Sequence, residues 1–136
     1  MKLERKILGL LVLTLLNSCQ IFDDGRNELI KEYFNPKQSL KLIVFEKYGN
    51  ATTNNSIQAS IHEYNYKLTD KEIGNIFVAD QIKSIKTSKD SLLNVKWIDN
   101  ETIEVVYPVS IRTFKTEKVF KSKTGEIKID YKTTNE

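Results

Sequence analysis

A two-residue period in the apolar side chains, which begins near residue 39 and continues to residue 131, constrains this chain more than any other feature. Ile57, Ala59 and Ile61 alternate with polar residues, so one side of their strand should be buried. The side chains expected to face outward are Gln58, Ser60 and His62. Residues 40–45 (LKLIVF) are apolar on both sides, which is typical of a central strand. The pattern predicts β structure.

Turn residues divide this region into short apolar stretches, which we expect to be strands. They are 40–45, 57–61, 76–79, 95–97, 103–107, 111–120 and 127–131. Asp99 and Asn100 suit one hairpin turn, and residues 123–125 suit a second. Residues 81–91 are polar and lysine-rich, so a loop with at most one turn of helix is expected. The sequence therefore predicts a mainly β fold, either a small antiparallel β-sandwich or a partly open barrel of six to seven strands.

One short amphipathic helix is expected before the β domain. Asp23 or Asp24 can cap it, and Pro36 can end it. The apolar residues that recur at helical spacing are Leu29, Ile30, Tyr33 and Phe34. This helix would connect the N-terminal region to the domain.

The N-terminal region has the form of an export signal. Basic residues at its start precede an apolar run at 7–16, which is shorter than the roughly 20 residues that span a membrane. Residues 16–19 (LNSC) resemble the bacterial lipobox, with leucine three positions before a cysteine and a small residue directly before it. The resemblance implies a covalent lipid on Cys19 and cleavage before it. An ordinary cleaved signal and an apolar N-terminal helix are the alternatives.

The lipobox resemblance divides the chain into three parts: a signal peptide at 1–18, a lipidated N-terminus with a helical stem at 19–38, and a β domain at 39–136. It implies a bacterial cell membrane or outer membrane location, anchored by lipid and facing the periplasm or the cell exterior. The lipid on Cys19 is the only non-protein group expected, so no cofactor is predicted. Because Cys19 is the only cysteine, no disulfide can form within the chain.

The charge of the mature chain gives no reason to expect nucleic acid. The signal carries three of the 21 Lys and Arg residues and one of the 18 Asp and Glu residues, which leaves a formal charge of +1. Lysines do alternate with aromatic residues in the last hairpin, but lysines on an exposed edge strand also prevent aggregation. If this surface binds anything, acidic glycans or lipid headgroups are the expected partners.

A second resemblance covers about half of the mature chain. Its residues are Val44 to Glu46 leading to Ala51 to Thr53, then Gly74 to Asp80, and then Trp97, Asp99 and Asn100. These stretches resemble a family of small secreted or lipid-anchored bacterial domains of unknown function. The resemblance implies a fold and no mechanism.

The residues that could carry chemistry do not form a recognisable motif. His62 is the only histidine, and its candidate partners are Glu63, which should point the opposite way, and the distant Asp80 and Asp99. Asp80 and Asp99 follow strands, where aspartate is common in turns. No catalytic residue and no metal site are therefore predicted.

A polar loop is the predicted binding site, because loops on a rigid β scaffold often carry binding residues. Its residues are Thr52, Thr53, Asn54 and Asn55. The expected function is a non-enzymatic binding or structural role in the cell envelope, with an envelope protein or a glycan as partner. A small envelope hydrolase that uses Asp or Glu residues is one alternative, and an inhibitor or immunity-type lipoprotein is another.

Overall fold

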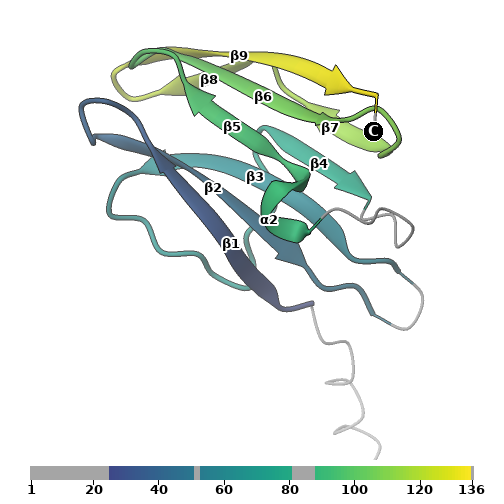
Figure 1. The fold of residues 1–136 in the computed structure, drawn as a ribbon. Coiled ribbons are helices and arrows are strands. Elements are labelled where there is room, and N and C mark those ends of the chain that lie inside the picture. The colour runs from purple at the N-terminus through teal and green to yellow at the C-terminus, as the bar shows by residue number, and fades with distance from the viewer. Residues whose placement is uncertain (1–24, 51–52, 81–87, 136) are drawn as a thin grey trace, which may run out of the picture.

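The computed structural model describes residues 25–50, 53–80 and 88–135, and within these ranges nine strands form two stacked sheets (Figure 1). The proposed signal, Cys19 and Thr52 lie outside the described residues. The elements are β1 (Asn27–Phe34), β2 (Leu40–Lys47), β3 (Ser56–Glu63), β4 (Phe77–Asp80), α2 (Lys89–Leu92), β5 (Asn94–Trp97), β6 (Thr102–Pro108), β7 (Thr113–Thr116), β8 (Val119–Ser122) and β9 (Gly125–Thr134).

The two sheets form a β-sandwich and are not closed into a barrel. The first sheet has the order β1-β2-β3-β4-β7, and the second has the order β5-β6-β9-β8. All pairs are antiparallel except β6 and β9, which run parallel. The predicted mainly β sandwich is confirmed. The described residues contain nine strands, not six or seven, because β1 occupies residues predicted to be helical and the single strand predicted at 111–120 is divided into β7 and β8.

The predicted N-terminal helix is wrong over the residues that the structure describes. Asn27–Phe34 is strand β1, which pairs with β2 at the edge of the first sheet. A bulge between Leu29 and Lys31 shifts the register, so Ile30 and Tyr33 both pack against the core although they are three residues apart. The bulge therefore explains why apolar residues at a helix-like spacing can face the core from a strand.

The core lies between the sheets, with β2 buried along almost its whole length as predicted. Ile57, Ala59 and Ile61 of β3 are completely buried, which confirms their predicted direction. Trp97 joins the two sheets at their edges, because its Nε1 donates to the carbonyl oxygen of Tyr33 at 2.9 Å. The single-layer core thus extends from one edge of the sandwich to the other.

Gln58 and Ser60 point away from the core as predicted, but they are not exposed, because the outer face of the first sheet is also covered. Residues 64–75, which we call the strap, cross this face. Gly74 donates its N–H to Gln58 Oε1 at 2.7 Å, and Asn75 donates its N–H to Ser60 Oγ at 3.0 Å. These polar side chains are buried because the strap backbone satisfies their hydrogen bonds.

The structure confirms the first predicted hairpin. It divides into two the single strand that was predicted before the second hairpin. β5 and β6 pair as expected around Asp99 and Asn100, and β8 and β9 pair around residues 123–124. Residues 111–120, however, contribute β7 to the first sheet and β8 to the second. The chain crosses between the sheets at Glu117, whose N–H donates to the carbonyl oxygen of Ile76 at 2.8 Å.

The sandwich has two distinct ends. At the entry end, Tyr48 donates its N–H to the carbonyl oxygen of Arg26 at 2.9 Å, just before β1 begins. At the far end, the β1–β2 turn meets the β5–β6 turn, where Lys37 donates its N–H to Asn100 Oδ1 at 2.9 Å. Figure 1 shows the turns of the far end on the left. A ligand site at either end would therefore combine loops from several strands.

Candidate functional site

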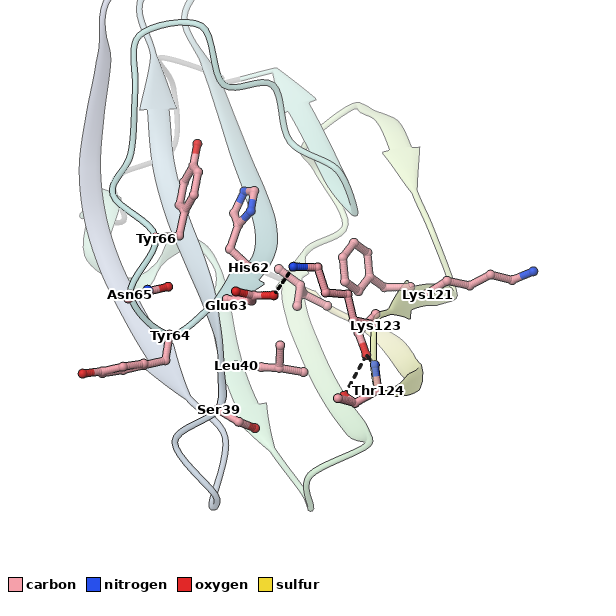
Figure 2. A pocket seen from close by; sticks show the side chains of 13 residues that line it. Ser39, Leu40, His62, Glu63, Tyr64, Asn65, Tyr66, Lys121, Lys123 and Thr124 are labelled. Carbon is pink, nitrogen blue, oxygen red and sulfur yellow. Dashed lines mark hydrogen bonds and ion pairs between the residues drawn. The ribbon is translucent and has the colours of Figure 1, made fainter.

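A groove of about 630 Å³ opens at the far end, where the end of β3 faces the β8–β9 turn. We call it the far-end groove, and Figure 2 shows its side chains. Its lining residues are Ser39, Leu40, Ile61, His62, Glu63, Tyr64, Asn65, Tyr66, Phe120, Lys121, Ser122, Lys123 and Thr124. The volume is in the range of pockets that hold small ligands.

The walls of the far-end groove combine apolar and charged groups. Leu40 and Ile61 are buried core residues, whereas the Tyr64 side chain is 57% exposed. Lys123 Nζ lies 2.9 Å from Glu63 Oε1 and joins the β8–β9 turn to the end of β3 (Figure 2). The hydrogen bond and charge of Lys123 lower the pKa of Glu63, and those of Glu63 raise the pKa of Lys123. Because both groups are exposed, this pair contributes little to stability and is available to a charged ligand.

His62, Tyr66 and Glu72 form a closed cluster beside the groove. His62 Nε2 lies 2.8 Å from Glu72 Oε1, and Tyr66 donates its hydroxyl to Glu72 Oε2 at 2.7 Å. An ionised carboxylate only accepts, so His62 must carry a proton on Nε2. The rings of His62 and Tyr66 stack with centroids 3.6 Å apart, and this contact fixes the position of Tyr66 at the groove. This partner of His62 could not be predicted, because Glu72 lies in the strap, whose sequence has no periodic pattern.

The cluster shifts the pKa values of its members. Burial raises the pKa of Glu72, but the hydrogen bonds from Tyr66 and His62 outweigh burial and hold it below the ordinary value of 4.5. Burial and the hydrogen bond to Glu72 raise the pKa of Tyr66. Both shifts favour an ionised Glu72 that accepts hydrogen bonds from Tyr66 and His62. The cluster therefore ties the strap to β3.

Acid should weaken this attachment of the strap. A carboxyl whose folded pKa is lowered stabilises the fold above its unfolded pKa, and this stabilisation disappears as the pH falls through the folded pKa. Glu72→Gln should reduce the free energy of unfolding at pH 7 by about 1–2 kcal/mol, because the charged acceptor is lost. It should also reduce the decline in stability between about pH 5 and pH 3. Urea unfolding from pH 3 to pH 7 would measure both effects.

The matched control for Glu72 is Glu126→Gln, which removes an exposed carboxylate on β9. This variant should keep the wild-type stability at pH 7 to within about 0.5 kcal/mol. If Glu72→Gln followed the same pH profile as the wild type, the proposed attachment of the strap by Glu72 would be wrong.

The loop predicted to bind lies at the entry end, away from the far-end groove. Thr53 and Asn54 line a separate pocket of about 520 Å³ at that end. Asn55 has a structural role, because its Nδ2 donates to the buried Glu46 carboxylate at 2.9 Å and its Oδ1 accepts from the N–H of Gly49 at 3.0 Å. Thr52 lies outside the described residues.

Glu46 is the most deeply buried carboxylate of the described chain. It lies on β2 with 1% of its surface exposed, and its second oxygen pairs with Lys89 of α2. The Lys89 ammonium also lies 5.5 Å from the centre of the Tyr48 ring. This pair holds α2 against the first sheet near the entry end.

The other candidate carboxylates are engaged separately. Arg112 Nη2 lies 2.5 Å from Asp80 Oδ2, and Asp99 Oδ1 accepts from the N–H of Glu101 at 2.8 Å in the β5–β6 turn. Neither residue lines the far-end groove with His62. Within the described ranges, no group of three or more His, Cys, Asp or Glu side chains is arranged to hold a metal ion.

Comparison with known proteins gives no relative. No protein-family model, no curated protein and no solved structure matches this chain. The resemblance to small secreted or lipid-anchored domains therefore stays a prediction. In the part of the chain that the structure describes, no helix has the length and apolar character needed to cross a membrane.

Proposed function

We propose that this protein is a lipid-anchored domain of the bacterial cell envelope that binds a partner in the far-end groove. The observation that carries the proposal is the groove itself, in which an exposed tyrosine and three charged residues, Glu63, Lys121 and Lys123, surround an apolar floor. Binding sites of this kind combine apolar walls with a few polar groups. The groove lies on a rigid scaffold of two packed sheets.

The proposed anchor would direct this groove away from the membrane. Cys19 precedes Gly25 by six residues, so the entry end lies within about 20 Å of the anchored sulfur even for a fully extended chain. β1 then runs for eight residues, or about 26 Å, to the far end. The far-end groove would face a partner in the surrounding space and not the bilayer that holds the protein.

Lipid labelling tests the anchor. Cells that express the wild type should incorporate radiolabelled palmitate into the protein, and Cys19→Ala should abolish this labelling, because the thiol is the proposed attachment atom. The variant should also be released into the soluble fraction. Lack of label in the wild type, together with recovery of a soluble protein, would refute the lipoprotein proposal.

Binding is favoured over hydrolysis because the carboxylates do not converge. Asp80 and Asp99 are held by separate partners. Of the two carboxylates near the groove, Glu63 is paired with Lys123, and Glu72 is held by His62 and Tyr66. A glycosidase needs one carboxyl that donates a proton and a second that faces it across the substrate. The proposal therefore assigns no reaction to these residues.

Tyr64-dependent capture tests the binding proposal. The full-length protein, solubilised from envelopes in detergent, should retain a glycan or protein partner in stoichiometric amount. Tyr64→Ala should lose it, because the exposed ring contributes contact area in the groove. The matched control is Phe114→Ala, which removes a ring that is 58% exposed on β7.

The outcomes of the capture experiment separate the candidate functions. Equal retention by the wild type and Tyr64→Ala would refute the groove as the binding site. A single protein partner that depends on Tyr64 would favour the inhibitor or immunity-type class.

A further inference from the structure

We infer that the far-end groove binds an anionic saccharide chain. This inference rests on the proposed binding function and names the class of ligand. Its structural basis is a surface that combines flat aromatic faces, lysines that have no carboxylate partner among the described residues, and a sheet edge that is closed to an added strand.

Aromatic side chains line two neighbouring grooves, which share residues 64–66 as their common wall. Tyr64, Asn65 and Tyr66 line the far-end groove and also a second groove of about 690 Å³ on the β1 side. The second groove is lined by Phe34, another exposed aromatic residue. Pyranose rings present flat C–H faces that pack against such rings, and two adjoining grooves suit a chain of several sugar units.

The charge of this surface favours an anion. Two glutamates line the grooves, and each is already paired with a lysine: Glu63 with Lys123 and Glu32 with Lys41. Lys67 and Lys121 also line the grooves, and among the described residues neither has a carboxylate within ion-pair distance. Lys121 points away from His62 and Glu63 in Figure 2, but its flexible side chain can turn toward a bound anion.

The edge of the first sheet next to the groove is closed to a peptide strand. Asn75 occupies both backbone groups of Ile61, accepting from its N–H and donating to its carbonyl oxygen, each at 2.9 Å. Tyr66 donates its N–H to the carbonyl oxygen of Glu63 at 3.0 Å. A partner that binds by strand addition needs these groups free. A saccharide does not need free backbone groups, because it binds to hydroxyl and amide groups of the protein's side chains.

Calorimetry with defined oligosaccharides tests the inference. The probes are tetragalacturonate, a hyaluronan tetrasaccharide and a heparin tetrasaccharide, added to the full-length protein in detergent. At least one should bind, and added salt should weaken it. Methyl-esterified tetragalacturonate and hexaglutamate are the neutral and peptide controls, and both should bind more weakly than the best acidic saccharide.

Two variants should separate the aromatic and charged contributions. Tyr64→Ala should weaken binding about tenfold, as expected when one stacking face is lost. Lys67→Gln combined with Lys121→Gln should weaken binding and reduce its dependence on salt. The matched double control is Lys71→Gln with Lys96→Gln, which removes two exposed lysines outside both grooves and should leave binding unchanged.

Three results would overturn the inference: no acidic saccharide binds, the neutral ester binds equally well, or hexaglutamate binds more tightly than every saccharide. If no saccharide binds but Tyr64-dependent capture of another partner persists, the inference fails and the proposed function stands. If both binding and capture are absent, both fail.

Discussion

Phe77→Ala should lower the free energy of unfolding by about 3–5 kcal/mol, the loss expected for a fully buried phenylalanine. Phe77 is 0% exposed on β4 and packs against rings of the second sheet, with centroids 5.2 Å from Tyr107 and 6.1 Å from Tyr131. Because Phe77 is held in the first sheet and both neighbouring rings are held in the second, the space left by the ring cannot collapse easily. Urea unfolding followed by far-UV circular dichroism would measure the loss.

Two further variants control for this prediction. Phe114→Ala removes the same side chain from an exposed position in the same sheet and should cost about 0.5 kcal/mol or less. Phe77→Leu keeps most of the buried volume and should cost about 1–1.5 kcal/mol, so a stability series remains if the alanine variant fails to fold. Similar losses for Phe77→Ala and Phe114→Ala would show that the ring does not support the contact between the sheets.

Lys89→Met should lower the free energy of unfolding by about 2–3 kcal/mol, because it leaves the Glu46 carboxylate buried without its cation. Asn55 would remain as a hydrogen-bond donor to Glu46. The expected loss is below that of a fully buried pair, since the Lys89 side chain is 46% exposed and water reaches it. Chemical unfolding at pH 7 would measure the change.

A double-mutant cycle tests the physical reason for this loss. Glu46→Gln in the Lys89→Met background should recover most of the lost stability, because a neutral amide needs no counter-charge. The matched control is Lys96→Met, which removes an exposed lysine on β5 and should have little effect. If the effects of Lys89→Met and Glu46→Gln simply added, the two residues would not be coupled and the pair would have no structural role.

The parts of the fold that could be predicted are those set by neighbours in sequence. Alternation identified the buried side of β3, and the continuous apolar run identified β2 as a central strand. Asp99 and Asn100 placed the β5–β6 hairpin, since a tight turn fixes the pairing of the strands that it joins. Each of these signals lies within about ten residues.

The errors arose where distant segments decide the environment of a residue. The spacing of Ile30 and Tyr33 indicated a helix, but pairing with β2 and a bulge produce the same spacing in a strand. Ser60 is buried because the strap covers it, and the sequence of β3 contains no information about that cover. The parallel pairing of β6 with β9 likewise joins strands that are separated by β7 and β8.

Most of the far-end groove could not be predicted from the sequence. The far-end groove combines the start of β2, the end of β3, the strap and the β8–β9 turn, and no single one of these segments has a binding motif. The polar loop at residues 52–55 was a reasonable expectation from loop chemistry, yet Asn55 serves the buried Glu46. Composition identifies a polar loop, but it does not show which buried groups of the protein its side chains form hydrogen bonds with.

The course of β1 has a mechanical consequence. This edge strand begins at the entry end, where the proposed anchor would be attached, and it ends at the far end beside the groove. A partner that pulled on the groove would load β1 along its length against β2. Because the hydrogen bonds of an antiparallel ladder are perpendicular to the strands, they would bear this load in shear and together, not one after another. With the proposed anchor at one end of β1 and the proposed partner at the other, this geometry would suit a domain that holds its partner under tension.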